Sequence, residues 1–370
     1  MSSSEHDSIV LIGARCHCGA NQFKIPFAKA DLPLKPDLCH CTSCRHVTGT
    51  LAVFAVPMKG QPLTPDSTSS NQTPANISSS PTLSQYNVSP HLTRHFCSTC
   101  SSYLFYEMVG TPATWCISVA LLDKVEGVAT VGYHMYVGDT LDGGFADHYR
   151  IQDGFEIPRY ENEEHTKPIP LGWTADRLLD KIKSSSGKDQ DSISAYCHCR
   201  QVSLSIKRQT EPPKEGEWWH VAGKEAEDPI RFKAGYCACN DCRLTSGSLF
   251  TPILFAPRSN IINTHTNKPI TLAFDTDPNA QDRIQGLIIY ESSPNTFREF
   301  CSKCGASVVS YPTHREGPDV DLVDVHVGLL DEEQDGSRAE RWLAWRDTVS
   351  WSKLALDQSG LEALEQSIRK

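Results

Sequence analysis

The chain has 370 residues, of which 39% are hydrophobic and 22% charged, and its formal net charge is −10. This length suits two globular domains, each large enough to bury its own core. The acidic balance argues against nucleic acid or an anionic membrane surface as a partner, because both are bound through clustered lysine and arginine side chains.

The beginning of the chain and its hydropathy predict a cytoplasmic protein, with a nuclear location left open. A polar stretch precedes a short apolar run at residues 9–12, which is too brief for the core of a signal peptide. Later apolar runs fall short of the length of a transmembrane helix. We therefore expect a compartment in which thiols stay reduced.

We expect the first domain at residues 8–153 and expect it to consist mainly of strands. Its segments, such as Gln22–Ile25, are short and alternate polar with β-branched or aromatic residues. The segment Gln61–Ser84 is rich in Ser, Thr, Asn and Pro, which predicts a long mobile loop. Cys116 falls in an expected strand, where a buried apolar thiol is the simplest interpretation.

A polar linker at residues 154–189 follows, with one short helix predicted over Ala175–Ile182. The second domain is expected at residues 190–356. Its clearest strand signals are Val202–Ile206, Gly286–Tyr290 and Asp321–Val327. The tail at residues 357–370 suits a short amphipathic helix from Gly360 onward.

The 15 cysteines follow a pattern that occurs twice: C-x-C, then C-x-C-x-x-C, then C-x-x-C. All except Cys116 belong to it. The first copy consists of Cys16, Cys18, Cys39, Cys41, Cys44, Cys97 and Cys100, and the second of Cys197, Cys199, Cys237, Cys239, Cys242, Cys301 and Cys304. The repeat extends to other residues, since Ser118–Asp123 matches His326–Asp331. A whole domain is therefore repeated, and the reducing compartment disfavours a disulfide framework.

These spacings predict two zinc ions in each domain and four in the chain. Zinc prefers four ligands in a tetrahedron, and the C-x-C and C-x-x-C pairs of one domain supply four thiolates for a closed structural site. The middle cluster offers only three. Zinc with three protein ligands keeps a position for water or substrate, which is typical of a catalytic site. The alternative is that a nearby histidine or aspartate closes this site.

Three motifs, Gly13–Ala20, Cys39–Gly49 and Phe96–Cys100, recur in the second half. On these residues the chain resembles the glutathione-dependent formaldehyde-activating enzyme family, which also includes centromere protein V. The resemblance implies a mainly β fold of two tandem zinc-binding β-tent domains, similar to the Rab-exchange-factor-like fold and built of small antiparallel sheets. It also implies a structural zinc on the outer pairs and a catalytic zinc on the middle cluster.

The activity that the resemblance implies is addition of glutathione to formaldehyde, which gives S-hydroxymethylglutathione. The chain would then be a carbon–sulfur lyase-type enzyme, with glutathione as co-substrate and a small thiol and an aldehyde as its partners. Two alternatives stay open: a zinc enzyme that acts on a larger metabolite of a biosynthetic pathway, and a non-catalytic zinc scaffold. The second half departs from the first at Ala238, which stands in place of His40.

Three further residues are candidates for catalytic roles. Arg45 and Arg243 directly follow the third cysteine of each middle cluster and could hold a carboxylate, such as that of glutathione, or neutralise the anionic zinc site. His40 could transfer a proton, or it could be a solvated loop residue. The Trp218–Trp219 pair could line a pocket or pack on the sheet. Near the end of the chain, the expected core or domain-packing residues are Trp342, Trp345 and Trp351.

Overall fold

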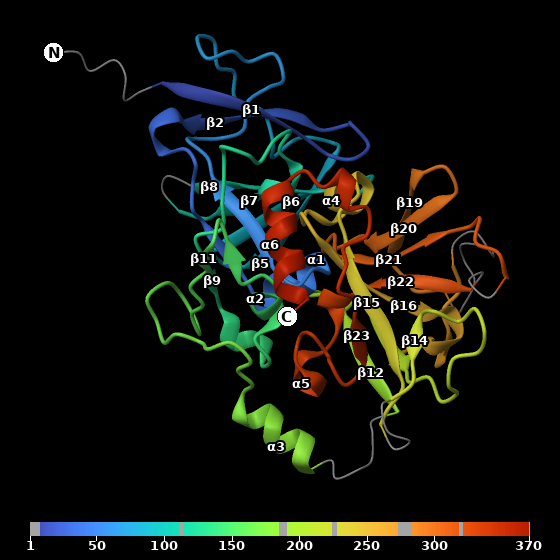
Figure 1. Ribbon diagram of the computed structural model, residues 1–370. Helices are drawn as coiled ribbons and strands as arrows, with labels where there is room; N and C mark the ends of the chain where they lie inside the picture. Colours follow the sequence, from blue (N-terminus) through green and yellow to red (C-terminus); the bar gives the residue numbers. More distant parts are fainter. Residues whose placement is uncertain are drawn as a thin grey trace.

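The computed structural model describes residues 8–110, 114–184, 191–223, 228–272, 283–317 and 321–369. The fold is mainly β and consists of two halves that lie side by side (Figure 1). Both halves are built on antiparallel sheets, as expected from the sequence. Within the described ranges, no helix combines the length and apolar character needed to cross a membrane.

A seven-stranded sheet forms the body of the first half. Only its β3–β9 pair is parallel among the pairings of this sheet. In spatial order, the strands are β5 (Leu83–Ser89), β6 (Leu92–Cys97), β7 (Tyr103–Met108), β8 (Thr114–Ser118), β4 (Val53–Pro57), β3 (Asp37–Cys39) and β9 (Tyr133–Met135). Two separate hairpins are formed by β1 (Ile9–Arg15) with β2 (Gln22–Ala28) and by β10 (Ile151–Gln152) with β11 (Phe155–Glu156).

The second half repeats this order of strands in an eight-stranded sheet. Its members are β14 (His220–Val221), β15 (Arg231–Cys237), β16 (Thr251–Pro257), β22 (Leu322–His326), β21 (Ser307–Pro312), β20 (Thr296–Cys301), β19 (Leu287–Ser293) and β23 (Leu343–Trp345), which is parallel to β15. A four-stranded sheet contains β12 (Ser192–Tyr196), β13 (Ser203–Lys207), β17 (Ile261–Asn263) and β18 (Lys268–Pro269). The run from β19 to β23 matches the run from β5 to β9, so the repeat in the sequence is a repeat in topology.

Helices are few and short. The α-helices are α1 (Thr42–Thr48), α2 (Gly144–His148), α3 (Asp176–Ser184), α4 (Asn240–Ser246), α5 (Glu332–Asp335) and α6 (Gln358–Ile368). Short 3₁₀ turns are η1 (Lys29–Asp31), η2 (Val119–Leu121), η3 (Val137–Thr140), η4 (Arg258–Asn260), η6 (Val327–Leu329) and η7 (Ser352–Leu354). The helices expected in the linker and the tail are confirmed as α3 and α6. The linker residues from 185 onward lie outside the described ranges.

Two segments extend from one part of the fold onto another. The segment predicted as a long mobile loop is a loop up to residue 82, since β5 begins one residue later, and it is tied to β2 by paired hydrogen bonds between Lys24 and Leu63 of 3.0 and 2.9 Å. Helix α6 follows the second half but packs on the first, where Arg150 donates its backbone N–H to Ser367 Oγ over 3.4 Å. Figure 1 shows α6 between the two halves.

The two halves contact each other through reciprocal bonds. His17 Nδ1 lies 2.7 Å from the hydroxyl of Tyr290, and His198 Nδ1 lies 2.8 Å from the hydroxyl of Tyr86. His17 and His198 are equivalent positions of the repeat, as are Tyr86 and Tyr290 on β5 and β19. This exchange is what a local two-fold arrangement of the two copies produces.

Glycine is required where each short cysteine-bearing helix ends against the other half. Gly49 follows α1 with a φ of 81°, and Gly247 follows α4 with a φ of 72°. A Cβ on Gly49 would lie 2.3 Å from the carbonyl oxygen of Ser307, and one on Gly247 would lie 2.8 Å from Cβ of Tyr103. The left-handed backbone and the close approach both select glycine.

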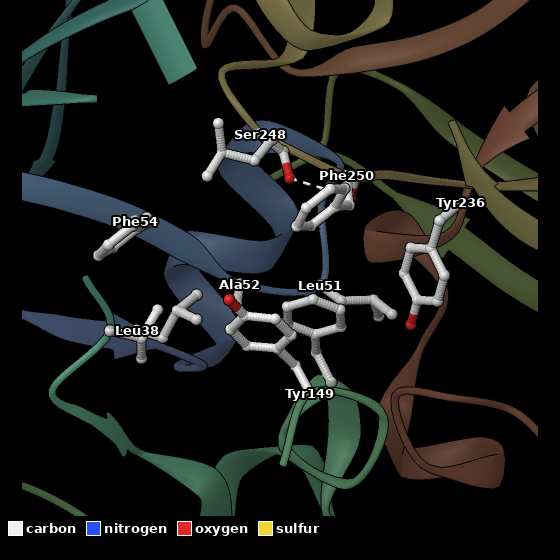
Figure 2. Close-up of a pocket in the computed structure, with 11 residues that line it drawn as sticks. Leu38, Leu51, Ala52, Phe54, Tyr149, Tyr236, Ser248 and Phe250 are labelled. Carbon is white, nitrogen blue, oxygen red and sulfur yellow. Dashed lines mark hydrogen bonds between the residues drawn. The ribbon is translucent and has the colours of Figure 1, made fainter. Parts of the chain in front are cut away.

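A small apolar pocket marks the seam between the halves (Figure 2). Its volume is about 30 Å³, and its walls include Leu38, Phe54 and Tyr149 from the first half and Tyr236 and Phe250 from the second. Ser248 turns its hydroxyl away to donate to the carbonyl of Phe250 over 3.1 Å. The seam is therefore a shared hydrophobic core with little room for a ligand.

Candidate metal centres

The outer cysteine pairs of each half converge on one point. In the first half, Cys16 and Cys18 lie at the turn after β1, and Cys97 and Cys100 lie at the turn after β6. The four sulfur atoms lie within 4.8 Å of one another. The same is true of the second quartet, which consists of Cys197, Cys199, Cys301 and Cys304.

The sulfur distances fit a zinc ion better than a disulfide. The distance from Cys16 Sγ to Cys18 Sγ is 3.5 Å, and that from Cys18 Sγ to Cys97 Sγ is 3.6 Å. Zinc–sulfur bonds of about 2.3 Å in a tetrahedron place the sulfur atoms about 3.8 Å apart. All cysteines of the chain lie in the described ranges, and all are free thiols. Both quartets could therefore hold zinc.

Backbone amides support these sulfur atoms. The N–H of Asn21 donates to Cys16 Sγ over 3.2 Å, and the N–H of Val202 donates to Cys197 Sγ over 3.4 Å. Such bonds stabilise negative charge on the sulfur and fix the orientation of a ligand. Because the quartets join segments about 80 residues or more apart, they would tie together distant parts of each half.

The middle clusters form two trios, Cys39 with Cys41 and Cys44, and Cys237 with Cys239 and Cys242. In each trio the three sulfur atoms lie within 4.8 Å of one another. The first cysteine ends a strand, the second caps the following helix and the third lies on its first turn. The N–H of Cys44 donates to Cys41 Sγ over 3.3 Å, and the N–H of Cys242 donates to Cys239 Sγ over the same distance.

In each trio one thiol is stabilised as a thiolate by its two neighbours. Hydrogen bonds from Cys39 and Cys44 lower the pKa of Cys41 to about 3. In the second half, hydrogen bonds from Cys237 and Cys239 lower the pKa of Cys242 well below that of an ordinary thiol. Thiolates are the form in which cysteine binds zinc, so both trios could hold an ion with three protein ligands.

A buried polar network beside the first trio crosses to the second half. Glu332 receives hydrogen bonds from Thr42 Oγ1 at 2.6 Å and lies 3.1 Å from Arg45 Nη2 and 3.0 Å from His46 Nε2. Burial opposes ionisation, but the bond from His46 and the charge of Arg45 outweigh it, and the pKa of Glu332 is lowered. The carboxylate that Arg45 holds is thus one from the other half of the chain.

His40 is fully buried, so its interpretation as a solvated loop residue is wrong. Its Nε2 lies 2.9 Å from Nδ1 of His134, and His134 in turn contacts the carbonyl of Tyr149. Burial, with the nearby His134 and Arg45, lowers the pKa of His40 well below its usual value. The imidazole is therefore neutral and supports the strand that carries Cys39.

Arg243 occupies the position of Arg45 but has different partners. Its Nη1 donates to the carbonyl of Ala120 in the first half, and its Nη2 donates to Asn240 Oδ1 over 2.9 Å. In the repeat, Lys124 stands where Glu332 stands in the other copy. A lysine at this position cannot form an ion pair with a guanidinium. This explains why, among the described residues, Arg243 has no ion pair equivalent to that of Arg45 with Glu332.

The second trio borders a cavity of about 550 Å³. Four other cavities among the described residues have walls that include neither trio. The wall of the large cavity combines the three thiols with aromatic and charged side chains, including Trp218, Phe255, Arg298, Arg315, Asp324 and Trp351. Its size falls in the range of sites that enclose small organic molecules.

Arg298 is a site residue that the sequence reasoning missed. It lies on β20, lines the cavity and donates from Nη2 to Cys242 Sγ over 3.4 Å and from Nε to Ser292 Oγ over 2.9 Å. Among the described residues, its Nη1 has no hydrogen-bond partner. The sequence signal was present, because Arg94-His95-Phe96-Cys97 and Arg298-Glu299-Phe300-Cys301 share the pattern R-x-F-C.

Arg94, the counterpart of Arg298, is used differently. Its guanidinium lies over the ring of Tyr103, 2.6 Å from the ring centroid, and Nη2 lies 3.5 Å from the hydroxyl of Tyr106. Burial lowers the pKa of Arg94 to about 10. The two arginines therefore share a place in the repeat, but only Arg298 combines a bond to a trio thiol with a position on the large cavity.

Trp351 differs from the expectation of a core residue, because 67% of it is exposed. Its counterpart in the first half is Tyr136. The N–H of His40 donates to Met135, the residue before Tyr136, and the N–H of Ala238 donates to Ser350, the residue before Trp351. Both aromatic residues have a left-handed backbone, with φ of 56° at Tyr136 and 58° at Trp351. Tyr136 is covered by the linker, where its N–H donates to the carbonyl of Asn162 over 2.7 Å.

The remaining tryptophans are placed as follows. Trp219 and Trp342 are buried, and Trp345 is half-buried. Trp218 is exposed, lines the large cavity and packs on Phe255 with ring centroids 4.9 Å apart. Of the two interpretations of the Trp218–Trp219 pair, the pocket lining therefore applies to Trp218 and the packing to Trp219.

Cys116 is half-buried on β8, and burial raises its pKa to about 11.

Fold and clusters together define a class: a tandem β protein in which each half has one four-thiol and one three-thiol site that could hold zinc. The sequence profile described as glutathione-dependent formaldehyde-activating enzyme matches residues 11–139 and 221–344. The chain therefore belongs to this family, as a member with two tandem copies of its domain. No curated protein matched the chain.

Proposed function

We propose that the second trio is the reactive centre of a carbon–sulfur lyase-type enzyme, which joins a thiol to an aldehyde and splits the adduct in reverse. One observation carries this proposal: Cys237, Cys239 and Cys242 line a cavity of about 550 Å³, so a substrate can reach their sulfur atoms. The description of the family, which names glutathione and formaldehyde, supports this choice of thiol and aldehyde.

The proposal includes four zinc ions, one on each quartet and one on each trio. A zinc ion held by the second trio would act as a Lewis acid toward a carbonyl oxygen and would favour the thiolate form of a bound thiol. The free thiols also support a reducing compartment such as the cytoplasm. The structural role of the quartets and the domain limits of 8–153 and 190–356 belong to the same proposal.

The reaction is balanced without an oxidant or a reductant. A bond forms between the thiol sulfur and the carbonyl carbon, the π pair of the carbonyl moves to its oxygen, and the thiol proton is transferred to that oxygen through water. Negative charge grows on the oxygen in the transition state. Arg298 is suited to stabilise it, because its guanidinium lines the cavity and donates to Cys242 Sγ.

The roles proposed for His40, Arg45 and Arg243 are positioning roles. Arg45 is held by Glu332, and Arg243 is held by Ala120 and Asn240, so each guanidinium fixes a cysteine-bearing helix against the other half. These contacts favour neutralisation of the metal site over capture of a substrate carboxylate. His40 supports β3 through His134.

A second candidate function, a non-catalytic zinc scaffold, suits the first half. Three residues beside its cysteines, Thr42, Arg45 and His46, are all engaged by the carboxylate of Glu332 from the other half. We therefore propose that the first trio stabilises the arrangement of the two halves, while the second trio performs the chemistry.

The test compares two equivalent thiol substitutions in the zinc-loaded full chain. The exchange of formaldehyde with its glutathione adduct is followed by NMR. Cys239→Ser is expected to lower the exchange rate more than 100-fold, because it removes a ligand of the reactive site. Cys41→Ser is expected to change it less than threefold. Equal losses in both variants, or no enzyme-dependent exchange in the native chain, would contradict the proposal.

A further inference from the structure

The second-half cavity is larger than the chemistry of a one-carbon aldehyde requires. Its volume of about 550 Å³ extends from the three thiols to an aromatic rim at Trp218, Phe255 and Trp351. Cavities of this order enclose organic ligands of considerable size, and their apolar walls supply much of the affinity. Formaldehyde has no group that could reach this rim.

Trp351 is the most unusual residue of the rim. It exposes 67% of its surface, and its φ of 58° and ψ of 34° lie in the left-handed region, which bulky residues rarely adopt. Strained backbone of this kind persists where the surrounding structure enforces it, often at ligand sites. Here Ala238 and Ser350 enforce it, because their backbone bond of 2.9 Å pins the residue before Trp351 to the loop that carries the trio.

The part of the rim formed by Trp218 and Phe255 is fixed by packing. Trp218 meets Phe255 edge to face, with ring centroids 4.9 Å apart and an interplanar angle of 65°. Phe255 lies on β16, beside β15, which ends at Cys237. The aromatic surface is therefore attached to the same sheet that positions the thiols.

The first half has no equivalent exposed aromatic at this position within the described ranges. Tyr136, the counterpart of Trp351, has its hydroxyl 3.0 Å from Glu163, and its N–H is bound by Asn162 of the linker. The same backbone geometry is thus covered in one copy and open in the other. Exposure of the indole is a property of the second site rather than a necessity of the fold.

We propose that this cavity is specific for thiol adducts of aldehydes that carry a planar apolar group, and that Trp351, with Trp218 and Phe255, binds this group. The inference rests on the proposed function and adds its substrate class. Contact of a planar ring with the indole faces would remove apolar surface from water at little cost in side-chain entropy.

The experiment uses two unreactive adduct analogues, S-benzylglutathione and S-methylglutathione, and the zinc-loaded full chain. Binding is measured by calorimetry and by quenching of tryptophan fluorescence. The native chain is expected to bind the benzyl ligand at least tenfold more tightly than the methyl ligand. Trp351→Ala is expected to reduce this preference to less than threefold, whereas the matched control Tyr136→Ala is expected to retain it.

The outcomes separate this inference from the proposed function. Equal affinities for the two ligands in the native chain, or a preference that survives Trp351→Ala, would overturn the inference, and NMR exchange of formaldehyde would still support the proposed function. A benzyl preference that Trp351→Ala removes supports the inferred ligand class. The same preference without exchange of any aldehyde would overturn the proposed reaction.

Discussion

The two trios of this protein have the same ligands in the same local fold but different neighbours. The first is bordered by Arg45 and His46, which bind Glu332 of the other half. Around the second, Lys124 stands at the position of Glu332, and a cavity of about 550 Å³ reaches the thiols. The comparison teaches that metal ligands alone do not define a reactive site, because the residues beside them determine access.

The same lesson applies to the two aromatic residues that follow the trio loops. Tyr136 and Trp351 have nearly the same left-handed backbone. The linker binds Tyr136, whereas no described segment covers Trp351 in the same way, and 67% of Trp351 is exposed. A segment that connects the two copies can cover only one of them. The position of the linker therefore makes the tandem chain asymmetric.

The largest expected effect is on stability and concerns Glu332. Glu332→Lys would remove the carboxylate that His46 contacts and place a second positive charge beside the buried Arg45, so we expect the free energy of unfolding to fall by about 3–5 kcal/mol. Urea denaturation measures it. The reciprocal change Lys124→Glu, at an exposed residue, should shift the same quantity by less than about 1 kcal/mol. Similar losses in both variants would remove the proposed difference between the two sites.

The next effect is on activity and concerns the paired arginines. Arg298→Lys keeps a positive charge but loses the planar guanidinium, so we expect the rate of adduct exchange to fall about 10- to 100-fold, which corresponds to about 1.4–2.7 kcal/mol in the barrier. Arg94→Lys should change the rate less than threefold. Zinc content and circular dichroism verify that both variants are folded. A larger loss in Arg94→Lys would place the chemistry in the first half.

The third effect is the response of the first half to acid, and it is small near neutral pH. Burial lowers the pKa of His134 to about 3, whereas the same position in the second half is occupied by Val349. Between about pH 3 and 6.5 the unfolded chain therefore binds the proton that folded His134 does not. Stability from this residue is complete above pH 6.5 and decreases by about 1.4 kcal/mol for each pH unit below it.

Hydrogen exchange by mass spectrometry, corrected for intrinsic rates, measures this response. Peptides of β3 and β9 should lose protection as the pH falls from 7 to 5, and this loss should be smaller in His134→Gln. If His134→Gln, which keeps a hydrogen-bonding group beside His40, shows the same acid response as the native chain, His134 is not its source.

Much of the site could be predicted from the cysteine pattern, because zinc ligands recur at spacings that strand ends and tight turns impose. All fourteen repeated cysteines fall into the expected quartets and trios. The mainly β fold and the tandem organisation followed from the same repeat. Side-chain surroundings were harder to foresee, since Glu332 and Arg45 are far apart in the chain and meet only through the packing of the two halves.

Two residues show where the sequence reasoning stopped. Arg298 sits in an R-x-F-C pattern, but an arginine on a strand is usually exposed, and only the structure reveals that it is buried beside Cys242. Trp351 was expected in the core because tryptophan is usually well buried. The backbone of the trio loop holds it outward instead, which no local propensity indicates.

The most direct test of the difference between the trios is the release of zinc to a chelator, followed with a colorimetric zinc indicator. We predict one rapidly released equivalent in the native chain, which disappears in Cys239→Ser and remains in Cys41→Ser, because the second trio lines a cavity of about 550 Å³. Two equivalents released at the same rate, or a rapid phase that disappears in Cys41→Ser, would contradict the assignment of the reactive centre to the second half.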